Sequence, residues 1–109
     1  MRRNDRPTRR TYDRHADPHP PRARRDLGDI WDYSRNRWGE RRAEAYLRQI
    51  SLDMRTVMDI PRLGQSAEEI RPGYRRFRSG SHVLFYRVTD TGIAVIRILH
   101  ERMDVTRHL

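Results

Sequence analysis

Apolar positions between residues 26 and 58 recur at the spacing of a helix with one buried face. The first stripe consists of Leu27, Ile30, Trp31 and Ser34. It predicts a helix from Asp26 to Trp38, with Gly39 as a natural stop. The second stripe consists of Ala43, Leu47, Ile50, Met54 and Val57. It predicts a longer helix from about Glu40 to Met58, and the short turn between the two helices predicts an antiparallel hairpin.

After residue 65 the period of the pattern changes from about four to two. The alternation predicts a short strand over about residues 73–78, a β-rich run over 82–89 and an apolar strand over 93–99. Ser79-Gly80-Ser81 and Asp90-Thr91-Gly92 supply the tight turns between them. The predicted fold class is α+β: a two-helix antiparallel hairpin packed on a three- (to four-) stranded antiparallel sheet.

The amino-acid composition excludes several kinds of catalytic and covalent chemistry. The chain has 109 residues, enough for one domain, and its 24 basic residues are all arginine. A lysine Schiff base and a P-loop lysine are therefore excluded, and the lack of cysteine excludes disulfides and thiolate nucleophiles. No apolar run approaches the roughly 18 residues that cross a bilayer, and the first residues lead into no signal-like stretch. We expect a soluble cytoplasmic protein with no membrane contact.

The positive charge is concentrated in residues 1–25, which hold nine arginines against three aspartates. This segment is rich in proline and poor in large apolar side chains, so we expect a disordered Arg/Pro-rich arm followed by a folded domain over 26–109. Such an arm can contact nucleic acid by counterion release or can be a solvated tail. The absence of interleaved aromatic residues favours the tail, and we expect no sequence-specific nucleic-acid binding.

Several separated blocks resemble one family. Ile70–Phe77 (IRPGYRRF), Gly80–Arg87 (GSHVLFYR) and Ile96–Asp104 (IRILHERMD) are similar to the ParE branch of the RelE/ParE toxin superfamily, and Asp29–Tyr33 (DIWDY) with Trp38-Gly39 agree with it. The resemblance covers roughly residues 26–109. It implies a type II toxin that inhibits DNA gyrase by binding and is neutralised by a ParD-like antitoxin.

The same resemblance leaves alternatives open. RelE-type relatives share the fold and cleave messenger RNA on the ribosome, and a degenerate toxin would only bind its antitoxin. Family members usually open with a short apolar strand before the first helix. Here that place is taken by the proline-rich segment 15–25, so this strand is expected to be absent or formed weakly at a sheet edge.

The nuclease residues of the RelE branch do not carry over. Its carboxy-terminal tyrosine has no counterpart in residues 104–109, and a strand position that holds arginine there corresponds to about Val83 here. The weak candidates for acid–base catalysis and phosphate contact are His100, Arg97 and Arg102, although a histidine at a strand end is more often structural. No cofactor is expected. No metal is expected either, because prolines break the helix that His15 and His19 would need.

Partner binding is the favoured role for a set of aromatic and basic residues. Tyr33 and Tyr46 lie off the apolar stripes and suit a groove for the antitoxin, in which aromatic side chains act as anchors. The predicted contact set is Tyr33, Tyr46, Arg71, Arg75, Arg76, Arg78, Arg87, Arg102 and Met103. The arginines of this set form either a basic docking surface or a solvated sheet face.

Two further side chains are given simpler roles. Arg97 stands among apolar neighbours, so it is expected to pair inside the fold with a carboxylate such as Glu101 or Asp104. His82, beside a predicted turn, is expected to be exposed on the hairpin.

Overall fold

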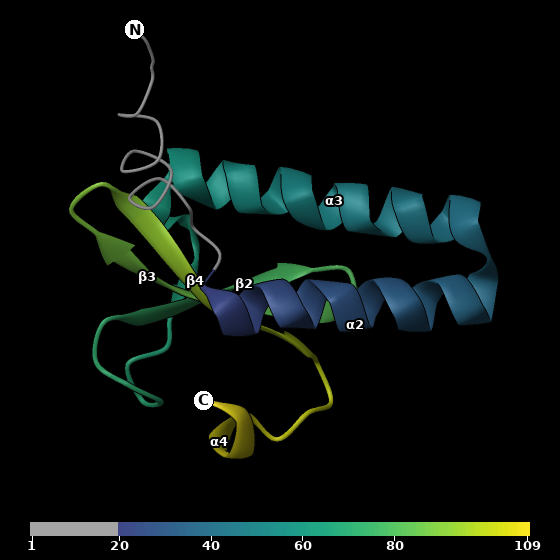
Figure 1. Ribbon diagram of the computed structural model, residues 1–109. Helices are drawn as coiled ribbons and strands as arrows, with labels where there is room; N and C mark the ends of the chain where they lie inside the picture. The colour runs from purple at the N-terminus through teal and green to yellow at the C-terminus, as the bar shows by residue number, and fades with distance from the viewer. Residues whose placement is uncertain (1–19) are drawn as a thin grey trace, which may run out of the picture.

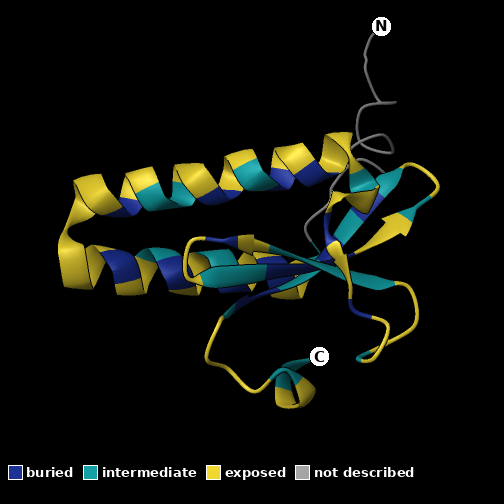
Figure 2. Ribbon diagram, turned by 180° about the vertical axis from the view of Figure 1, so that it is seen from behind, coloured by how far each residue is buried: buried dark blue, intermediate teal, exposed yellow. Residues whose placement is uncertain are grey.

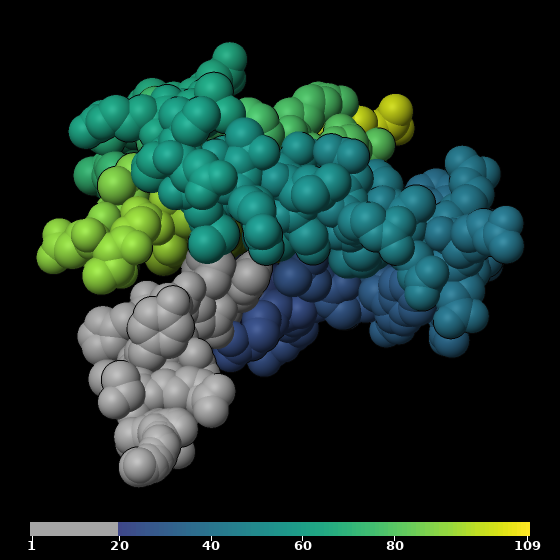
Figure 3. Space-filling model, turned by 90° about the horizontal axis from the view of Figure 1, so that it is seen from above, coloured from purple at the N-terminus to yellow at the C-terminus, as the bar shows by residue number. Residues whose placement is uncertain are grey.

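The computed structural model describes residues 20–109, in which a long helical hairpin packs against an antiparallel sheet. Helix α2 (Pro21–Trp38) and helix α3 (Glu40–Asp59) run side by side in opposite directions, as Figure 1 shows. Gly39 joins them with φ +94, a conformation that glycine adopts without steric cost. The turn end of the hairpin projects beyond the sheet (Figure 3). The predicted pair of helices is confirmed.

Helix α2 begins five residues earlier than predicted. Pro20 is the N-cap and Pro21 opens the first turn, where the missing N–H costs nothing and the ring already fixes a helical φ. Ala23 is fully buried and belongs to the hydrophobic core. The expected division at residue 25 is therefore wrong for residues 21–25, which belong to α2, while residues 1–19 lie outside the described residues.

The sheet contains four strands in the order β1-β2-β3-β4, each antiparallel to its neighbour. They are β1 (Gln65–Ser66), β2 (Tyr74–Ser79), β3 (His82–Thr89) and β4 (Gly92–His100). The pairing of β3 with β4 shifts between Phe85 and Tyr86, where a bulge accommodates one extra residue of β4. The last three strands agree with the prediction.

Three short elements have no counterpart in the prediction, and the first is a single 3-10 turn, η1 (Pro61–Leu63), after α3. Strand β1 adds two residue pairs to the outer edge of β2 and supplies the fourth strand. Helix α4 (Val105–His108) closes the chain, and the Asp104 side chain caps it by accepting from the Thr106 backbone N–H. The amino-terminal strand that the resemblance implies has no equivalent from residue 20 onward, and residues 15–19 of that segment are outside the described range.

The hydrophobic core lies between the helical hairpin and one face of the sheet. Figure 2 shows the buried stripes of both helices facing the strands. The helices contribute Ile30, Ile50, Met54 and Val57, and the strands contribute Leu84, Tyr86, Ile93, Val95 and Ile98. Among residues 20–109 there is no helix with the length and apolar character that a membrane span requires.

Candidate partner-binding groove

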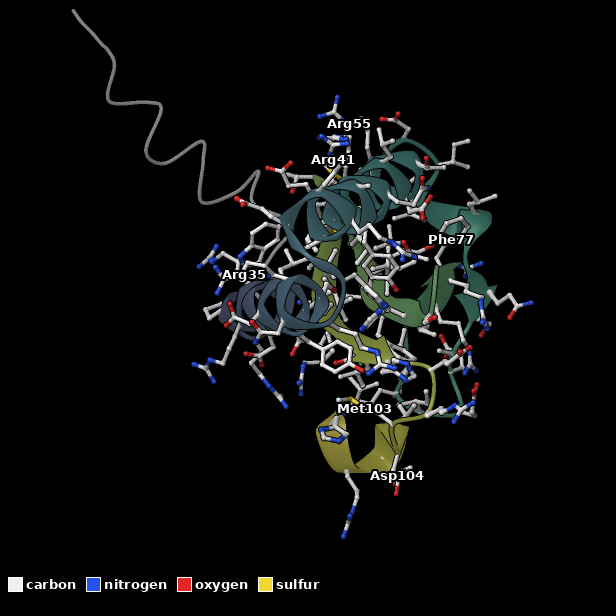
Figure 4. All side chains as sticks on the ribbon, turned by 90° about the vertical axis from the view of Figure 1, so that its right-hand side faces the viewer. Arg35, Arg41, Arg55, Phe77, Met103 and Asp104 are labelled. Carbon is white, nitrogen blue, oxygen red and sulfur yellow. The ribbon has the colours of Figure 1, made fainter. Side chains whose placement is uncertain are left out.

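A groove of about 430 Å³ lies where α2 passes the turn between β2 and β3 and the segment after β4. We call it the aromatic groove, and its main lining side chains are Ile30, Tyr33, Trp38, Tyr46, His82, His100 and Met103. Tyr33, Trp38 and Met103 are exposed although they are large and apolar. Met103 lies between α2 and α4 in Figure 4, on the segment that follows β4. An open apolar hollow of this kind suits a side chain supplied by another molecule.

The rings of the groove form one continuous series of contacts. Tyr33 meets the edge of Trp38, with ring centroids 6.2 Å apart, and Trp38 lies 6.3 Å from Tyr46. Tyr46 contacts His82, which in turn meets His100 edge to face at 5.3 Å. The predicted partner residues Tyr33, Tyr46 and Met103 are thus brought together in one place, on three separate segments of the chain.

His82 is not the exposed hairpin residue that the sequence suggested. It is half-buried, and its Nδ1 lies 2.6 Å from the Tyr46 hydroxyl oxygen, which also accepts the Ser81 backbone N–H. Burial lowers the pKa of His82, and the positive charge that His100 can carry lowers it further. The prediction failed because Tyr46 is distant in sequence and no local pattern reveals the contact.

Arg97 pairs with Asp26 of α2, and not with Glu101 or Asp104 as expected. Its Nε and Nη2 donate to the two carboxylate oxygens of Asp26 at 2.8 and 2.9 Å, and this hydrogen bonding raises the pKa of Arg97. Asp26 also accepts the backbone N–H of Ile98 on β4. Sequence reasoning missed Asp26 because it appeared to be only the first residue of a helix.

Arg97 reaches the end of the chain as well. Its Nη1 donates to the His108 carbonyl at 2.6 Å, and Nη2 of Arg22 donates to the same oxygen at 2.8 Å. Two arginines from different elements therefore hold the carboxy-terminal helix against α2 and β4. This network is a structural clamp that engages every nitrogen of the Arg97 guanidinium.

The remaining predicted arginines divide into engaged and open side chains. Arg75 donates to the carbonyls of Gly64 and Arg62, so its role is to fix the loop before β1. Arg76 pairs with Glu69, and Arg78 pairs with Glu101. For the side chains of Arg71, Arg87 and Arg102 no hydrogen bond or ion pair to another described residue occurs, and all three are exposed.

The weak catalytic candidates His100 and Arg97 both have hydrogen-bond partners within the fold. His100 accepts the backbone N–H of Arg102 at its Nδ1, a local turn contact. Arg97 is committed to Asp26 and to the His108 carbonyl. In the described part of the chain no group of three or more histidine or acidic side chains is placed to hold a metal ion.

Comparisons with known proteins agree with this architecture. The family described as "ParE toxin of type II toxin-antitoxin system, parDE" matches residues 20–105. Toxin ParE1 of Mycobacterium tuberculosis H37Rv is 50% identical over 90 residues, which cover 82% of this chain and 92% of that protein. Toxin ParE1 of Caulobacter vibrioides is 46% identical over 88 residues, or 81% and 91% of the two chains.

A solved structure described as "Chromosomal ParDE TA system from P. aeruginosa" has a similar fold. Its TM-score is 0.67 at 20% identity, and the match covers 75% of this chain and 90% of that one. At this level of identity the likeness concerns the fold alone.

Proposed function

The chain belongs to the ParE toxin family of type II toxin–antitoxin systems, and from this we propose that it inhibits DNA gyrase by binding and is neutralised by a ParD-like antitoxin that docks in the aromatic groove. The observation that carries the proposal is the groove itself. Tyr33, Trp38 and Met103 are large apolar side chains held in place by the fold and left open to solvent.

The state of the basic residues supports action by binding. A nuclease needs cations free to meet a phosphate and an acid–base group free to move a proton. Arg97 is fully engaged within the fold, and His100 uses its Nδ1 in a turn. The exposed arginines Arg71, Arg87 and Arg102 instead suit an acidic surface of a partner, because guanidinium groups bind carboxylates in a bidentate manner.

A supercoiling assay tests the choice of target. Purified full-length chain is titrated into gyrase with relaxed plasmid, with and without the antitoxin encoded beside it. We expect loss of supercoiling that the antitoxin restores. Normal supercoiling at micromolar toxin would overturn the gyrase target.

Messenger RNA toeprinting on translating ribosomes separates the alternatives. Cleavage that His100→Ala abolishes would identify an RelE-type nuclease. Absence of both activities with retained complex formation would identify a chain that only binds its antitoxin.

The docking site is tested by a pair of exposed apolar residues. Tyr33→Ala removes a groove anchor that is 61% exposed, so the fold should tolerate it. We expect the affinity for the antitoxin to fall about tenfold or more, as for a typical interface anchor. Leu52→Ala is the matched control, because Leu52 is 54% exposed on α3 and does not line the groove. If the Tyr33 variant binds the antitoxin with the same affinity as the wild type, the groove is not the docking site.

A further inference from the structure

The hydrogen bonds at the base of the groove favour one tautomer of His82. The oxygen of Tyr46 accepts the Ser81 N–H at 2.9 Å, so its own hydrogen is available for the Nδ1 of His82 at 2.6 Å. Among the described residues the Tyr46 hydroxyl has no other hydrogen-bond partner. With the Tyr46 hydroxyl as the donor, Nδ1 is the acceptor, and a neutral ring then carries its proton on Nε2.

Close packing keeps Tyr46 in this position. A Cβ atom added to Gly80 would lie 2.7 Å from a ring carbon of Tyr46 and 2.8 Å from its hydroxyl oxygen. Gly80 also has φ +62, which favours glycine on its own account. The ring rests directly on the turn between β2 and β3, so the hydroxyl is held against His82 and Ser81.

His100 has the same tautomer for a different reason. Its Nδ1 accepts the Arg102 backbone N–H at 3.1 Å, so in the neutral ring the proton is again on Nε2. Each imidazole of the pair thus has its acceptor nitrogen occupied and only an N–H donor left. The two Nε2–H groups can therefore donate hydrogen bonds to a molecule in the groove, and neither imidazole offers that molecule an acceptor.

We propose that the His82–His100 pair selects an uncharged apolar segment of the antitoxin, one that brings a neutral hydrogen-bond acceptor to the groove, and that this segment binds while the His82 imidazole is neutral. The proposal rests on the proposed function, because it takes the antitoxin as the occupant. A main-chain carbonyl or a side-chain amide oxygen is the complementary acceptor.

The surroundings of the pair argue against a charged occupant. Most of the lining is aromatic or aliphatic, and a charge moved there from water would lose its hydration. Asp29 lines the groove and Glu101 follows His100, so a carboxylate of the antitoxin would meet like charge. An ammonium or guanidinium group could pair with Asp29 at the rim, but beside the two imidazoles it would find N–H donors and no acceptor.

Proton linkage follows from the same geometry. The groups that act on His82 are Tyr46 of α3, His100 of β4, Asp26 of α2 and Glu101, and the two carboxylates favour protonation. Burial and His100 outweigh them, so the pKa of His82 is already lowered in the free chain. An apolar segment over the groove excludes more water and disfavours the imidazolium further. Affinity should therefore fall as the pH falls.

Isothermal titration calorimetry on the full chain and the antitoxin encoded beside it tests this. Affinity should be constant above about pH 7 and should fall measurably as the pH is lowered below the ordinary histidine value of about 6.5, a window above the ordinary carboxylate pKa values. His82→Gln should reduce this dependence. His108→Gln, in α4 and outside the groove, should retain it. Circular dichroism at each pH verifies that the chain is folded.

A measurement on the unchanged chain covers the case in which the His82 variant does not fold. Long-range ¹⁵N–¹H correlation spectra of the full chain at about pH 7.5 report imidazole tautomers directly. We expect both His82 and His100 to carry the proton on Nε2. A proton on Nδ1 of either ring would overturn the proposal.

The outcomes separate this inference from the proposed docking site. A flat affinity profile, or affinity that rises on acidification, would overturn the inference that His82 must be neutral, while a weakened Tyr33→Ala variant still supported docking in the groove. If Tyr33→Ala binds as tightly as the wild type, the groove is not the docking site and both proposals fail.

Discussion

At the scale of single residues, Asp26 connects α2 to β4 through one carboxylate. It accepts two hydrogen bonds from Arg97 and one from the Ile98 backbone N–H, and both charged side chains are largely buried. A buried ion pair adds modest net stability, yet removal of one partner leaves the other charge without compensation. Loss of Asp26 should therefore be costly because it would leave the Arg97 guanidinium largely buried without an anionic partner, although the net stability that the intact pair adds is modest.

Asp26→Asn tests this role. The amide removes the anionic partner of Arg97, and we expect the free energy of unfolding to fall by about 3 kcal/mol. Urea denaturation followed by circular dichroism measures the change. Glu69→Gln is the control, because its ion pair with Arg76 is exposed and should contribute little. Equal midpoints for the two variants would contradict the assignment.

A second residue-scale prediction concerns Gly64, which lies against a buried tyrosine. The Tyr86 hydroxyl accepts the Gly64 N–H and donates to the Pro61 carbonyl, and a Cβ at Gly64 would lie 2.4 Å from that oxygen. Gly64→Ala should therefore displace Tyr86 and cost on the order of 1–3 kcal/mol. Thermal unfolding measures it.

Gly28 provides the opposite case for the same substitution. It lies inside α2 with no atom within 4 Å of an added Cβ. Gly28→Ala should raise the free energy of unfolding by up to about 1 kcal/mol, since alanine favours the helix. If both alanine variants shift the melting temperature in the same direction, the packing argument at Gly64 is wrong.

At the scale of elements, the sequence predicted the helices and strands whose apolar residues recur at a regular local spacing. The helical stripes and the alternation in β2, β3 and β4 depend on neighbours a few residues away, so their existence could be predicted. Strand β1 could not, because two residues carry no period and its pairing depends on β2. Helix α4 left a weak signal, an aspartate two residues before a threonine, which is typical of an N-cap.

The candidate site was predictable only in part. Tyr33 and Tyr46 could be proposed from the sequence because they lie off the predicted apolar stripes, which is a local property. The contacts Tyr46–His82 and Asp26–Arg97 join residues 36 and 71 positions apart, and nothing in a local window indicates them. The arginines show the same limit, because composition gives their charge but only the fold shows that Arg75 and Arg97 are engaged.

Helix α4 gives the element-scale prediction. Its His108 carbonyl accepts from both Arg22 and Arg97, so deletion of residues 105–109 removes a shared acceptor and uncovers the Asp26–Arg97 pair. We expect faster amide hydrogen exchange in the first turns of α2 and at Ile98, with a loss of roughly 1–2 kcal/mol. Hydrogen–deuterium exchange with mass spectrometry localises the effect.

Deletion of Leu109 alone is the matched control for that truncation. It turns His108 into the carboxy terminus, whose carboxylate can accept from the same two arginines with charge assistance. Exchange in α2 should stay slow. If the shorter deletion loosens α2 as much as the longer one, the two arginine contacts do not hold the terminus.

At the scale of the whole molecule, the fold separates packing from recognition. One face of the hairpin is used by the core, whereas the aromatic groove opens beside α2 at the edge of that packing. Side chains such as Arg41 and Arg55 point outward from α3, away from the sheet (Figure 4). The molecule therefore offers partners an apolar hollow, and the whole chain carries a net charge of +9. Association with an acidic partner should be accelerated by this charge and slowed by salt.

The last prediction concerns folding stability against pH, which sums over the titrating groups of the molecule. The pKa of His82 is lowered in the folded chain, and in the unfolded chain it returns to about 6.5. A group of this kind contributes stability that is complete above pH 6.5 and is lost as the pH falls toward the folded-state value. Glu69, whose pKa is also lowered, acts only below its unfolded value near 4.5, and the raised pKa of Arg97 matters only in strong alkali.

We therefore expect the urea midpoint of the full chain to be level from about pH 8 to 7 and to decrease from about pH 6.5 to 5, because in that window the unfolded state binds a proton that the folded state excludes. Tyr46→Phe removes the hydroxyl that donates to His82 Nδ1 and the acceptor for Ser81. It should lower the midpoint at neutral pH and reduce the decrease on acidification, since a free Nδ1 is protonated more easily. An equal decrease in both proteins would place the responsible group elsewhere than at the Tyr46–His82 contact.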